Sequence, residues 1–502
     1  MLSENSMHPS KKFAFDVGIT LLASVITLPL GFIITVLLGR YLGAGDLGLY
    51  RMASAIYGIA MLVAAIGIPA AMIKYVAEFK DDRTKFNQIV SSGIITSLFL
   101  GIGFVALFYF SSGLFAEIFN MPGLSGLLKI LSPVFPFALV GGALLGLLNG
   151  LREMKKYAAA TIIQSFLMVV ITVALIYYGF GVAGAVIGVV LASVGYCLFL
   201  IWTTRKYFGI TFSNYIQTTK KMLKFGAQIF GANAINMVNY QADTLLIGYF
   251  LTATDVGHYA VAVGLSRFFW IVPQAVQTIT YPATSEYWSN NNHAALQTMI
   301  DKSMKYTACI LLPIGLAVGF FAKEIITTIF GEGFVYSVLP LHILLTGTVI
   351  FGIGCKAIGG SLSGVNRPDL SLKTTSAGAI INIILNVSLI PYFGIIGAAI
   401  ATAVSLITMS FIFDGLTIKT LLIKLDIKWF AQITETTLIA IFSFVVGNRF
   451  ANTYVLGFSI LIVYITLIFA LFLTNEDRTL LKSLIFSFKN KMALLQKGRN
   501  QG

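Results

Sequence analysis

The sequence contains few charged residues, and this scarcity excludes a soluble fold. Only 11% of its 502 residues are charged, 57% are hydrophobic, and the mean hydropathy is +0.87. Soluble domains carry about 25% charged residues. A membrane-spanning helix needs about 20 mostly apolar residues, and runs of that length recur along the whole chain. We therefore expect an all-α polytopic membrane protein.

Cysteine and histidine are also scarce, with three and four residues, and neither type forms a metal-binding or redox pattern. Cys197, Cys309 and Cys355 lie in separate apolar runs without C-x-x-C spacing, so we expect small buried hydrophobic residues. The sequence has no G-x-x-x-x-G-K-[ST] loop, no H-E-x-x-H and no nucleophile elbow. It therefore predicts neither an enzyme nor an ATPase, and no organic cofactor or metal centre.

Fourteen apolar stretches are long enough to span a membrane. They run near residues 13–38, 47–76, 87–110, 126–150, 157–178, 183–204, 222–250, 256–285, 303–321, 336–362, 372–391, 394–417, 429–447 and 453–473. The first stretch is too long for a signal-peptide h-region and no A-x-A-like site follows it, so no cleavable signal peptide is expected.

The apolar stretches fall into two similar halves. Three pairs of matching segments share an offset of 209 to 214 residues: GRYLGAGDLGLY at 39–50 with GYFLTATDVGHY at 248–259, FGVAGA at 180–185 with FGIIGA at 393–398, and Gly146 and Gly150 with Gly360 and Gly364. Residues 43–48 also fit G-x-G-x-x-G, but they join two apolar runs and not a strand and a helix, so a tight turn is expected.

The repeat predicts two bundles of six helices each, with a substrate path between them. The predicted divisions are 1–210, 215–425, two extra helices over 426–475 and a basic tail over 476–502. Because six is an even number, both bundles enter the membrane in the same direction, as a parallel repeat.

The net charge of +14 could indicate nucleic-acid binding, but its distribution indicates membrane topology instead. Most of the 34 Lys and Arg residues fall on one side of the expected bundle. The opposite loops hold only Arg40, Lys129, Lys323 and Arg449. The positive-inside rule therefore places both termini in the cytoplasm.

Two arginines fall within or near expected spans. Arg51 lies near the outer end of the second span, with Ser54 on the same helical face, and Arg267 lies inside the eighth span. Residues that follow Arg267 at helical spacing are Trp270, Gln274, Gln277 and Tyr281. An arginine at a helix centre costs about 2.5–3.5 kcal/mol to insert, so it tends to face the bundle interior or water.

Guanidinium groups bind phosphate bidentately, so this polar stripe is a candidate substrate-binding surface. The alternative is structural: Arg51 extends to the membrane interface and Arg267 pairs with a carboxylate.

The seventh span carries a second polar face. Asn233, Asn236, Tyr240 and Asp243 follow at steps of three, four and three residues, so we expect them on one side of a helix. Asp243 is taken as the only intramembrane carboxylate of the repeated core. This face is a candidate site for Na⁺ or H⁺ coupling, or else a set of interhelical hydrogen bonds.

Two further positions join these candidates. Asp16 begins a stripe of small, mostly hydroxylated residues on the first span, which suits either the wall of a wet cleft or close packing, and Asp16 is added to the ion-coupling group. On the fourth span Gly142, Gly146 and Gly150 form a small-residue ladder that indicates helix packing. The second copy has Lys356 in place of Gly142, so Lys356 joins the substrate-binding group.

The segments at 39–50 and 241–259 resemble polysaccharide-export flippases of the multidrug/oligosaccharidyl-lipid/polysaccharide (MOP) superfamily, and the resemblance covers most of residues 10–425. It implies two bundles that open alternately to either side, and a substrate made of a polyprenyl lipid, a pyrophosphate and a glycan. In the related lipid II flippases, cleft arginines lie on the second and eighth helices, where Arg51 and Arg267 fall. The last two helices resemble those that form a lipid groove. The first helix lacks the arginine of lipid II flippases, which argues against lipid II as substrate.

The leading interpretation is therefore a flippase of the cytoplasmic membrane for polyprenyl-pyrophosphate-linked oligosaccharide. Its expected partners are that lipid-linked glycan, membrane lipids and the glycosyltransferases or polymerase of the same pathway, and not nucleic acid. Three alternatives stay open: a cation-coupled drug or small-molecule exporter, a lipid II-type flippase, and a non-transporting scaffold or scramblase-like component.

Overall fold

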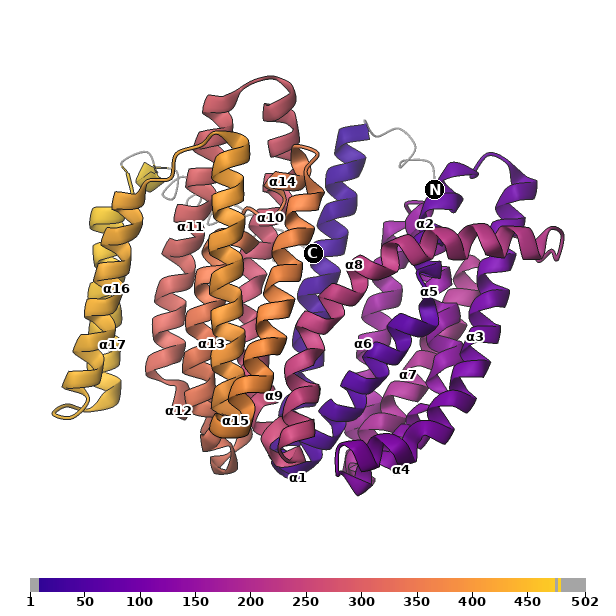
Figure 1. Ribbon diagram of the computed structural model, residues 1–502, viewed down its shortest axis with the longest axis horizontal. Coiled ribbons are helices and arrows are strands. Elements are labelled where there is room, and N and C mark those ends of the chain that lie inside the picture. Colours follow the sequence, from indigo (N-terminus) through magenta and orange to yellow (C-terminus); the bar gives the residue numbers. More distant parts are fainter. Residues whose placement is uncertain (1–8, 475–476, 480–502) are drawn as a thin grey trace, which may run out of the picture. The chain divides into compact units, whose positions relative to one another are not determined.

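The computed structural model describes residues 9–474 and 477–479, and its regular elements are helices (Figure 1). They are α1 (Pro9–Ala65), α2 (Ile68–Glu78), α3 (Arg83–Ile118), α4 (Pro122–Leu131), α5 (Val134–Gly150), α6 (Met154–Tyr177), α7 (Gly181–Thr204), α8 (Tyr215–Phe250), α9 (Ala253–Arg267), η1 (Phe268–Trp270), α10 (Ile271–Ser289), α11 (His293–Phe320), α12 (Ala322–Phe330), η2 (Glu332–Ser337), α13 (Val338–Phe351), η3 (Gly352–Lys356), α14 (Ser361–Gly364), α15 (Pro368–Leu421), α16 (Ile427–Gly447), α17 (Thr453–Leu467) and η4 (Ile468–Phe472). No strand occurs among the described residues, which confirms the all-α prediction. Most of the predicted basic tail lies outside them.

Within the described residues, ten helical segments are long and apolar enough to cross a membrane, or eleven if the α4–α5 pair, bent by 50°, forms one span. The protein is thus a multi-pass membrane protein, although the count differs from the fourteen spans expected. The expected span 222–250 corresponds to α8, which is not among the ten. Its asparagine and glutamine residues lower its hydropathy.

Two of the long helices consist of two helical stretches joined at a glycine. Gly43 interrupts α1 with φ of 86°, and Gly394 interrupts α15 with φ of 58°. Both angles lie in the left-handed region, which glycine adopts without steric cost. Figure 1 shows α1 turning back at this point. The G-x-G-x-x-G segment is therefore a turn between two helices, as the sequence predicts.

The structure also carries the internal repeat. Gly181 and Gly394, which are equivalent in the repeat, adopt nearly the same backbone angle, with φ of 55° and 58°. A Cβ on Gly48 would lie 1.6 Å from the carbonyl oxygen of Ala253, and one on its equivalent Gly257 would lie 2.0 Å from that of Ala44. Because Ala44 and Ala253 are equivalent too, the two matching segments cross each other in a symmetrical backbone contact.

The glycine ladders pack against helices in equivalent places. In the first copy, a Cβ on Gly146 would lie 2.7 Å from the carbonyl oxygen of Pro69 in α2. In the second copy, a Cβ on Gly360 would lie 2.6 Å from Tyr281 of α10, and one on Gly364 would lie 3.0 Å from Thr284. Both ladders therefore let two helices approach closely, as small residues at this spacing do.

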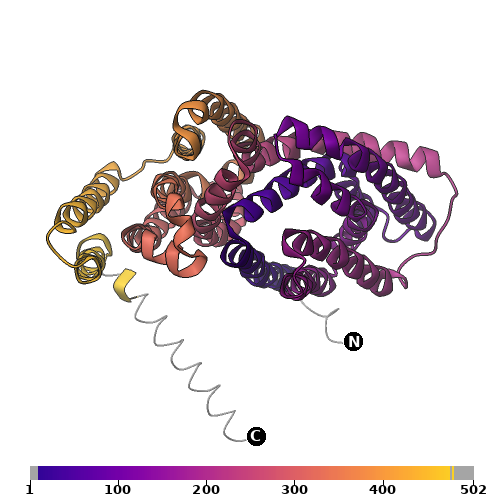
Figure 2. The same ribbon diagram turned by 90° about the horizontal axis from the view of Figure 1, so that it is seen from below.

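The helices group into two compact units, and each is described separately. Unit 1 comprises Met1–Phe268, Lys323–Gly347 and Ser371–Met409, and unit 2 comprises Phe269–Ala322, Thr348–Leu370 and Ser410–Gly502. The core of unit 1 forms where α2, α3, α5 and α7 pack around buried residues such as Met72, Leu144 and Leu147. Several of these helices are seen end-on in Figure 2.

Unit 2 has two hydrophobic clusters. One gathers residues of α11, α14 and the end of α15, and the other joins α11 to α16 and α17. In the second cluster the rings of Phe320 and Phe444 stack with their centroids 4.0 Å apart. The two extra C-terminal helices are thus held against α11 by apolar contacts within this unit.

Candidate functional site

Buried polar side chains surround Asp243 of α8 in unit 1. Its Oδ1 accepts a hydrogen bond from the amide of Asn386 at 2.8 Å. Its Oδ2 accepts hydrogen bonds from the hydroxyls of Tyr259, at 2.8 Å, and Thr402, at 2.6 Å. Tyr259 belongs to α9, whereas Asn386 and Thr402 belong to α15. Three helices therefore meet at one carboxylate, which is only 8% exposed.

This cluster contains oxygen atoms that lack a hydrogen-bond donor. The amide oxygens of Asn382 and Asn386 are buried and have no hydrogen-bond partner among the described residues. Asn382 donates through its amide nitrogen to Thr402, at 3.3 Å, so it belongs to the same cluster. Carboxylate, amide and hydroxyl oxygens are the ligands that hard cations prefer. The residues present therefore fit a small cation or a proton at Asp243.

The sequence pattern identified Asp243 but not its hydrogen-bond partners, which lie on other helices. On the continuous helix α8, Asn233, Asn236 and Tyr240 are exposed, whereas Asp243 is buried. The partners of Asp243 come instead from α9 and α15. A sequence signal for Asn382 and Asn386 does exist, because two asparagines four residues apart in an apolar run lie on one helical face.

Arg51 and Arg267 both lie in unit 1. Arg51 is half-buried in α1, where it donates to the hydroxyl of Thr35, and its Nε has no hydrogen-bond partner among the described residues. Arg267 ends α9, donates to the carbonyl oxygen of Tyr240 at 3.2 Å and holds its guanidinium 4.8 Å from the centre of that ring.

Neither arginine forms an ion pair with a described carboxylate. The pairing with a carboxylate that the sequence left open for Arg267 is therefore not found in the described chain. The two guanidinium groups are near enough for their charges to repel each other. Asp243 is near enough to attract Arg267 electrostatically, but no ion pair with a described carboxylate forms. Two neighbouring guanidinium groups of this kind form a region suited to an anionic ligand.

The expected polar stripe after Arg267 is not on one continuous α-helix. The span expected near 256–285 is present as the continuous helical segment Ala253–Ser289, in which a 3₁₀ turn, η1, separates α9 from α10. The turn changes the angular spacing of the side chains that follow, since 3₁₀ and α-helices differ in residues per turn. Gln274 is exposed on α10, and Gln277 is half-buried.

In unit 2 two contacts involve predicted substrate-binding residues: Lys356 of η3 with Trp270 of η1, and Gln277 of α10 with the turn after η3. The ammonium of Lys356 lies 5.7 Å from the centre of the Trp270 ring. The amide of Gln277 packs against Gly359, where a Cβ would come within 2.6 Å of its nitrogen. A lysine, an indole and an amide in this arrangement can hold polar and ring-shaped groups.

The remaining predicted residues have local partners. Ser54 donates to the carbonyl oxygen of Tyr50, four residues earlier in its helix. Asp16 is half-buried and lies 3.8 Å from the guanidinium of Arg152, which precedes α6. On the expected hydroxylated stripe, Thr20 donates to the backbone carbonyl of Asp16. These contacts agree with a structural part for Ser54 and Asp16.

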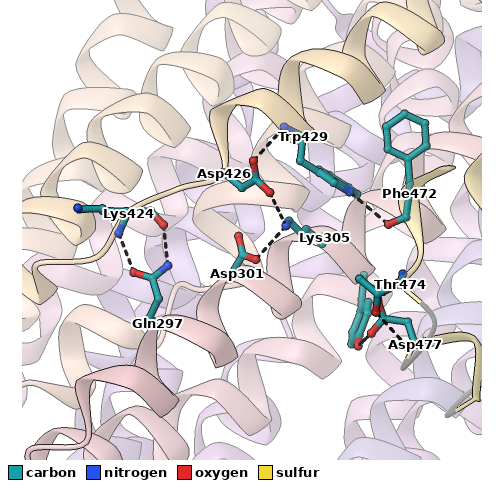
Figure 3. Close-up of polar contacts among 10 residues, drawn as sticks. Gln297, Asp301, Lys305, Lys424, Asp426, Trp429, Phe472, Thr474 and Asp477 are labelled. Carbon is teal, nitrogen blue, oxygen red and sulfur yellow. Dashed lines mark hydrogen bonds and ion pairs between the residues drawn. The ribbon is translucent and has the colours of Figure 1, made fainter.

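A polar cluster joins α11 to the start of α16 in unit 2 (Figure 3). The ammonium of Lys305 lies 3.0 Å from Asp301 and 2.8 Å from Asp426, and 5.4 Å from the ring centre of Trp429. The Trp429 indole donates to the carbonyl oxygen of Phe472. Hydrogen bonds from Lys305 and from the backbone N–H of Trp429 lower the pKa of Asp426, which lies outside the spans. This cluster anchors the C-terminal helix pair.

The same helix α16 carries an apolar groove of about 700 Å³. Its lining side chains are Ile427, Phe430, Ala431, Thr434, Glu435, Leu438, Ile439 and Phe442. The resemblance implied a lipid groove formed by the two C-terminal helices, whereas this open, mostly apolar surface is lined by α16 alone.

Comparison with known proteins gives one matching family and several similar chains. The family model described as "Polysaccharide biosynthesis protein" matches residues 37–339. The chain is 25% identical over 387 residues to the "Probable flippase AglR" of Haloferax volcanii. The aligned region covers 76% of this chain and 79% of AglR.

Solved structures share the fold. The structure titled "Lipid II flippase MurJ, inward closed conformation" superposes with a TM-score of 0.75 at 18% identity, covering 89% of this chain and 98% of that one. An inward-facing multidrug resistance MATE family transporter of the MOP superfamily gives a TM-score of 0.61 at 15% identity, covering 78% and 94%. At these identities the similarity establishes the fold alone.

Proposed function

The chain belongs to the polysaccharide biosynthesis protein family of the MOP superfamily, and we propose that it is a flippase for a polyprenyl-pyrophosphate-linked oligosaccharide. The observation that carries this proposal is the pair Arg51 and Arg267, two cationic groups in one unit without a described carboxylate partner. Charged side chains inside membrane spans are costly, and where they occur they usually mark a ligand site or an ion pathway. A pyrophosphate supplies the missing negative charge.

In this proposal the arginines bind the pyrophosphate, and other polar residues contact the glycan. Arg51 presents an Nε that has no described partner, and a guanidinium can engage two phosphate oxygens at once. Trp270, Gln277 and Lys356 offer a ring and two hydrogen-bonding groups for sugars, and Gln274 and Ser54 complete the predicted set. The groove on α16 accommodates the polyprenyl tail, which stays in an apolar environment while the head group crosses.

The topology is proposed with fourteen spans. Three features of the helices support that number. Of the ten qualifying segments, α1 and α15 each divide into two spans, at Gly43 and Gly394. The α4–α5 pair and α8 add one span each. We propose divisions at 1–210, 215–425, 426–475 and 476–502, with both termini cytoplasmic. This orientation rests on the concentration of Lys and Arg in the loops of one side.

Transport is proposed to be coupled to an ion at Asp243. The chain has no Walker motif, so a gradient or the membrane potential is the available energy source. The Asp243 cluster supplies a buried carboxylate and the hydroxyl of Thr402 for Na⁺ or H⁺. It also supplies the amide oxygens of Asn382 and Asn386, which accept no hydrogen bond from a described residue. Each elementary charge that crosses 100 mV contributes about 2.3 kcal/mol, so outward movement of an anionic pyrophosphate also gains from an inside-negative potential.

A second candidate function is a cation-coupled exporter of drugs or other small molecules, which the Asp243 cluster favours. A drug exporter binds cationic or neutral compounds, and two arginines without acidic partners would repel cations. A flippase of the lipid II type is a further alternative, and the absent arginine on the first helix argues against it.

The experiment is reconstitution in liposomes with a fluorescent polyprenyl-pyrophosphate oligosaccharide. Arg267→Ala removes one charged hydrogen-bonding group, worth about 1.5–3 kcal/mol, so we expect flipping to slow by about tenfold to a hundredfold. Arg267→Lys should recover only part of the rate, because the bidentate fork is lost. Arg449→Ala, on an exposed expected loop, is the matched control.

Normal flipping by a correctly inserted Arg267→Ala protein would exclude the pyrophosphate role. Transport of cationic drugs in place of the lipid-linked glycan would favour the exporter.

A further inference from the structure

Asp414 is a further acidic residue inside the expected spans, besides Asp16, Asp243 and Glu435, and the sequence interpretation overlooked it. It lies on α15, within unit 2, about two turns before that helix ends at Leu421. The statement that Asp243 is the only intramembrane carboxylate of the repeated core is therefore wrong. The Oδ1 atom of Asp414 is buried and has no hydrogen-bond partner among the described residues.

The carboxylate packs against an irregular turn. After α13, residues Gly352–Lys356 form the π-helix η3, a feature that is frequent at functional sites. A Cβ on Gly354 would lie 2.3 Å from Oδ2 of Asp414 and 2.2 Å from Oγ of Ser410. Only a glycine at this position leaves room for the acid and the hydroxyl beside the backbone. The bulge and Asp414 therefore form one packed site.

Ser410 connects the acid to the bulge. Its hydroxyl oxygen accepts a hydrogen bond from the backbone N–H of Cys355 at 3.3 Å. The same oxygen lies 3.1 Å from Oδ2 of Asp414 and 3.4 Å from the carbonyl oxygen of Ile350. A serine hydroxyl has one hydrogen, so it can donate fully to only one of these two acceptors.

A neutral Asp414 resolves this shortage of donors. With a proton on Oδ2, the acid donates to Ser410, and Ser410 donates its own hydrogen to Ile350. Ser410 then accepts from the acid and from Cys355, which uses both of its lone pairs. An ionised Asp414 would compete with Ile350 for a single hydrogen, and its Oδ1 would carry charge without a donor.

The charged and titratable groups around the acid do not neutralise it. Cys355 and Lys356 of η3 are the titratable groups nearest to it along the bulge, and the ammonium of Lys356 lies over Trp270 instead. Asp414 forms no ion pair with a described Lys or Arg. Asp414 is half-buried as a residue, and its Oδ1 is buried. A carboxyl that is shielded from water in this way and has no cationic partner binds a proton more readily than an exposed one.

The geometry points to Asp414 as a proton-binding site in unit 2, separate from the Asp243 cluster, with Ser410 and the π-helix bulge as its hydrogen-bonding frame. One proton from water binds Oδ2, and its release returns the Ser410 hydrogen from Ile350 to the carboxylate. The two protonation states thus bond differently to the backbone of the bulge. This site goes beyond the proposed function, which assigns ion coupling to Asp243.

The experiment is infrared difference spectroscopy of the purified full-length protein in lipid as the pH is raised. We expect a carboxylic-acid C=O band that disappears with increasing pH in the parent protein and is absent from Asp414→Asn. Asp243→Asn, which changes a buried carboxyl of unit 1, is the matched control and should keep that band. Because this readout does not require flipping, a failed transport assay leaves its result intact.

A second variant tests the frame. Ser410→Ala removes the hydrogen-bond acceptor of the acid, so the band should shift to higher frequency and its pH midpoint should move. The proposal is overturned if the band persists in Asp414→Asn, if it does not change with pH, or if Ser410→Ala leaves both its frequency and its midpoint unaltered. A band that responds to Na⁺ at constant pH would also overturn it, since the site would then bind a metal cation.

Discussion

Replacing Thr402 by valine should weaken cation binding at the Asp243 cluster. The two side chains have nearly the same shape, so Thr402→Val removes one oxygen and one donor with little change in volume. In the native cluster that hydroxyl lies 2.6 Å from Oδ2 of Asp243 and accepts from Asn382 at 3.3 Å. Both Asp243 and Asn386 stay in place.

The expected magnitude follows from these contacts. A hydrogen bond to a charged group contributes about 1.5–3 kcal/mol, and each 1.4 kcal/mol corresponds to about tenfold in affinity. If Thr402 also ligates the ion, its loss should raise the half-saturating Na⁺ concentration by about tenfold to a hundredfold. Loss of one neutral bond to Asn382 adds little to this.

The assay is thermal unfolding of the purified protein in NaCl against choline chloride. Binding to the folded state raises the melting temperature with ligand concentration, so the Na⁺ titration reports the affinity. Thr408→Val is the matched control, because Thr408 lies on the same helix and donates only to the carbonyl oxygen of Val404. An identical Na⁺ dependence in the parent, Thr402→Val and Thr408→Val proteins would refute the cation site. A parent protein whose melting temperature does not respond to Na⁺ but depends on pH, with the pH dependence lost in Asp243→Asn, would identify the ion as H⁺.

Two further predictions concern topology and the C-terminal helices. The topology is tested by single cysteines in a protein that lacks Cys197, Cys309 and Cys355. An impermeant maleimide added to intact cells should react with Gly45→Cys and not with Lys221→Cys. The reverse pattern would contradict the proposed orientation. Asp426→Asn keeps the N-cap of α16 but removes the charge that pairs with Lys305, so it should lower the stability at neutral pH by about 0.2–1 kcal/mol, because the pair is partly exposed. The folded-state pKa of Asp426 lies below its ordinary 3.8, so this difference should be fully present above 3.8 and be lost as the pH falls through the lower, folded-state pKa. A difference that persists at still lower pH would exclude the ion pair as its cause.

Local sequence patterns were sufficient where one helix or one turn decides the structure. The apolar runs predicted the long helices, the glycines at 43–48 predicted the turn at Gly43, and the small-residue ladder predicted the close packing at Gly146. A left-handed backbone angle or a close helix contact demands glycine wherever it occurs. The requirement is therefore visible in the residue type itself.

The sequence was insufficient where a side chain finds its partners on other helices. Helical spacing placed Asp243 beside Asn236, but in the structure its partners are Tyr259, Asn386 and Thr402. Spacing along one helix gives the direction of a side chain and does not say which helix packs on that side. The 3₁₀ turn after Arg267 adds a second cause, because a single change of helix type rotates every residue that follows.

The sequence by itself determined that this chain is an all-helical membrane protein built from a repeat, because hydropathy and glycine placement are properties of each segment. Only the tertiary structure decided which polar groups share a site: Asp243 with asparagines more than a hundred residues away, and Asp414 with the bulge after α13. The physical reason is that a buried polar group must find its hydrogen-bond partners in space, and contacts between helices bring together residues that are far apart in the chain.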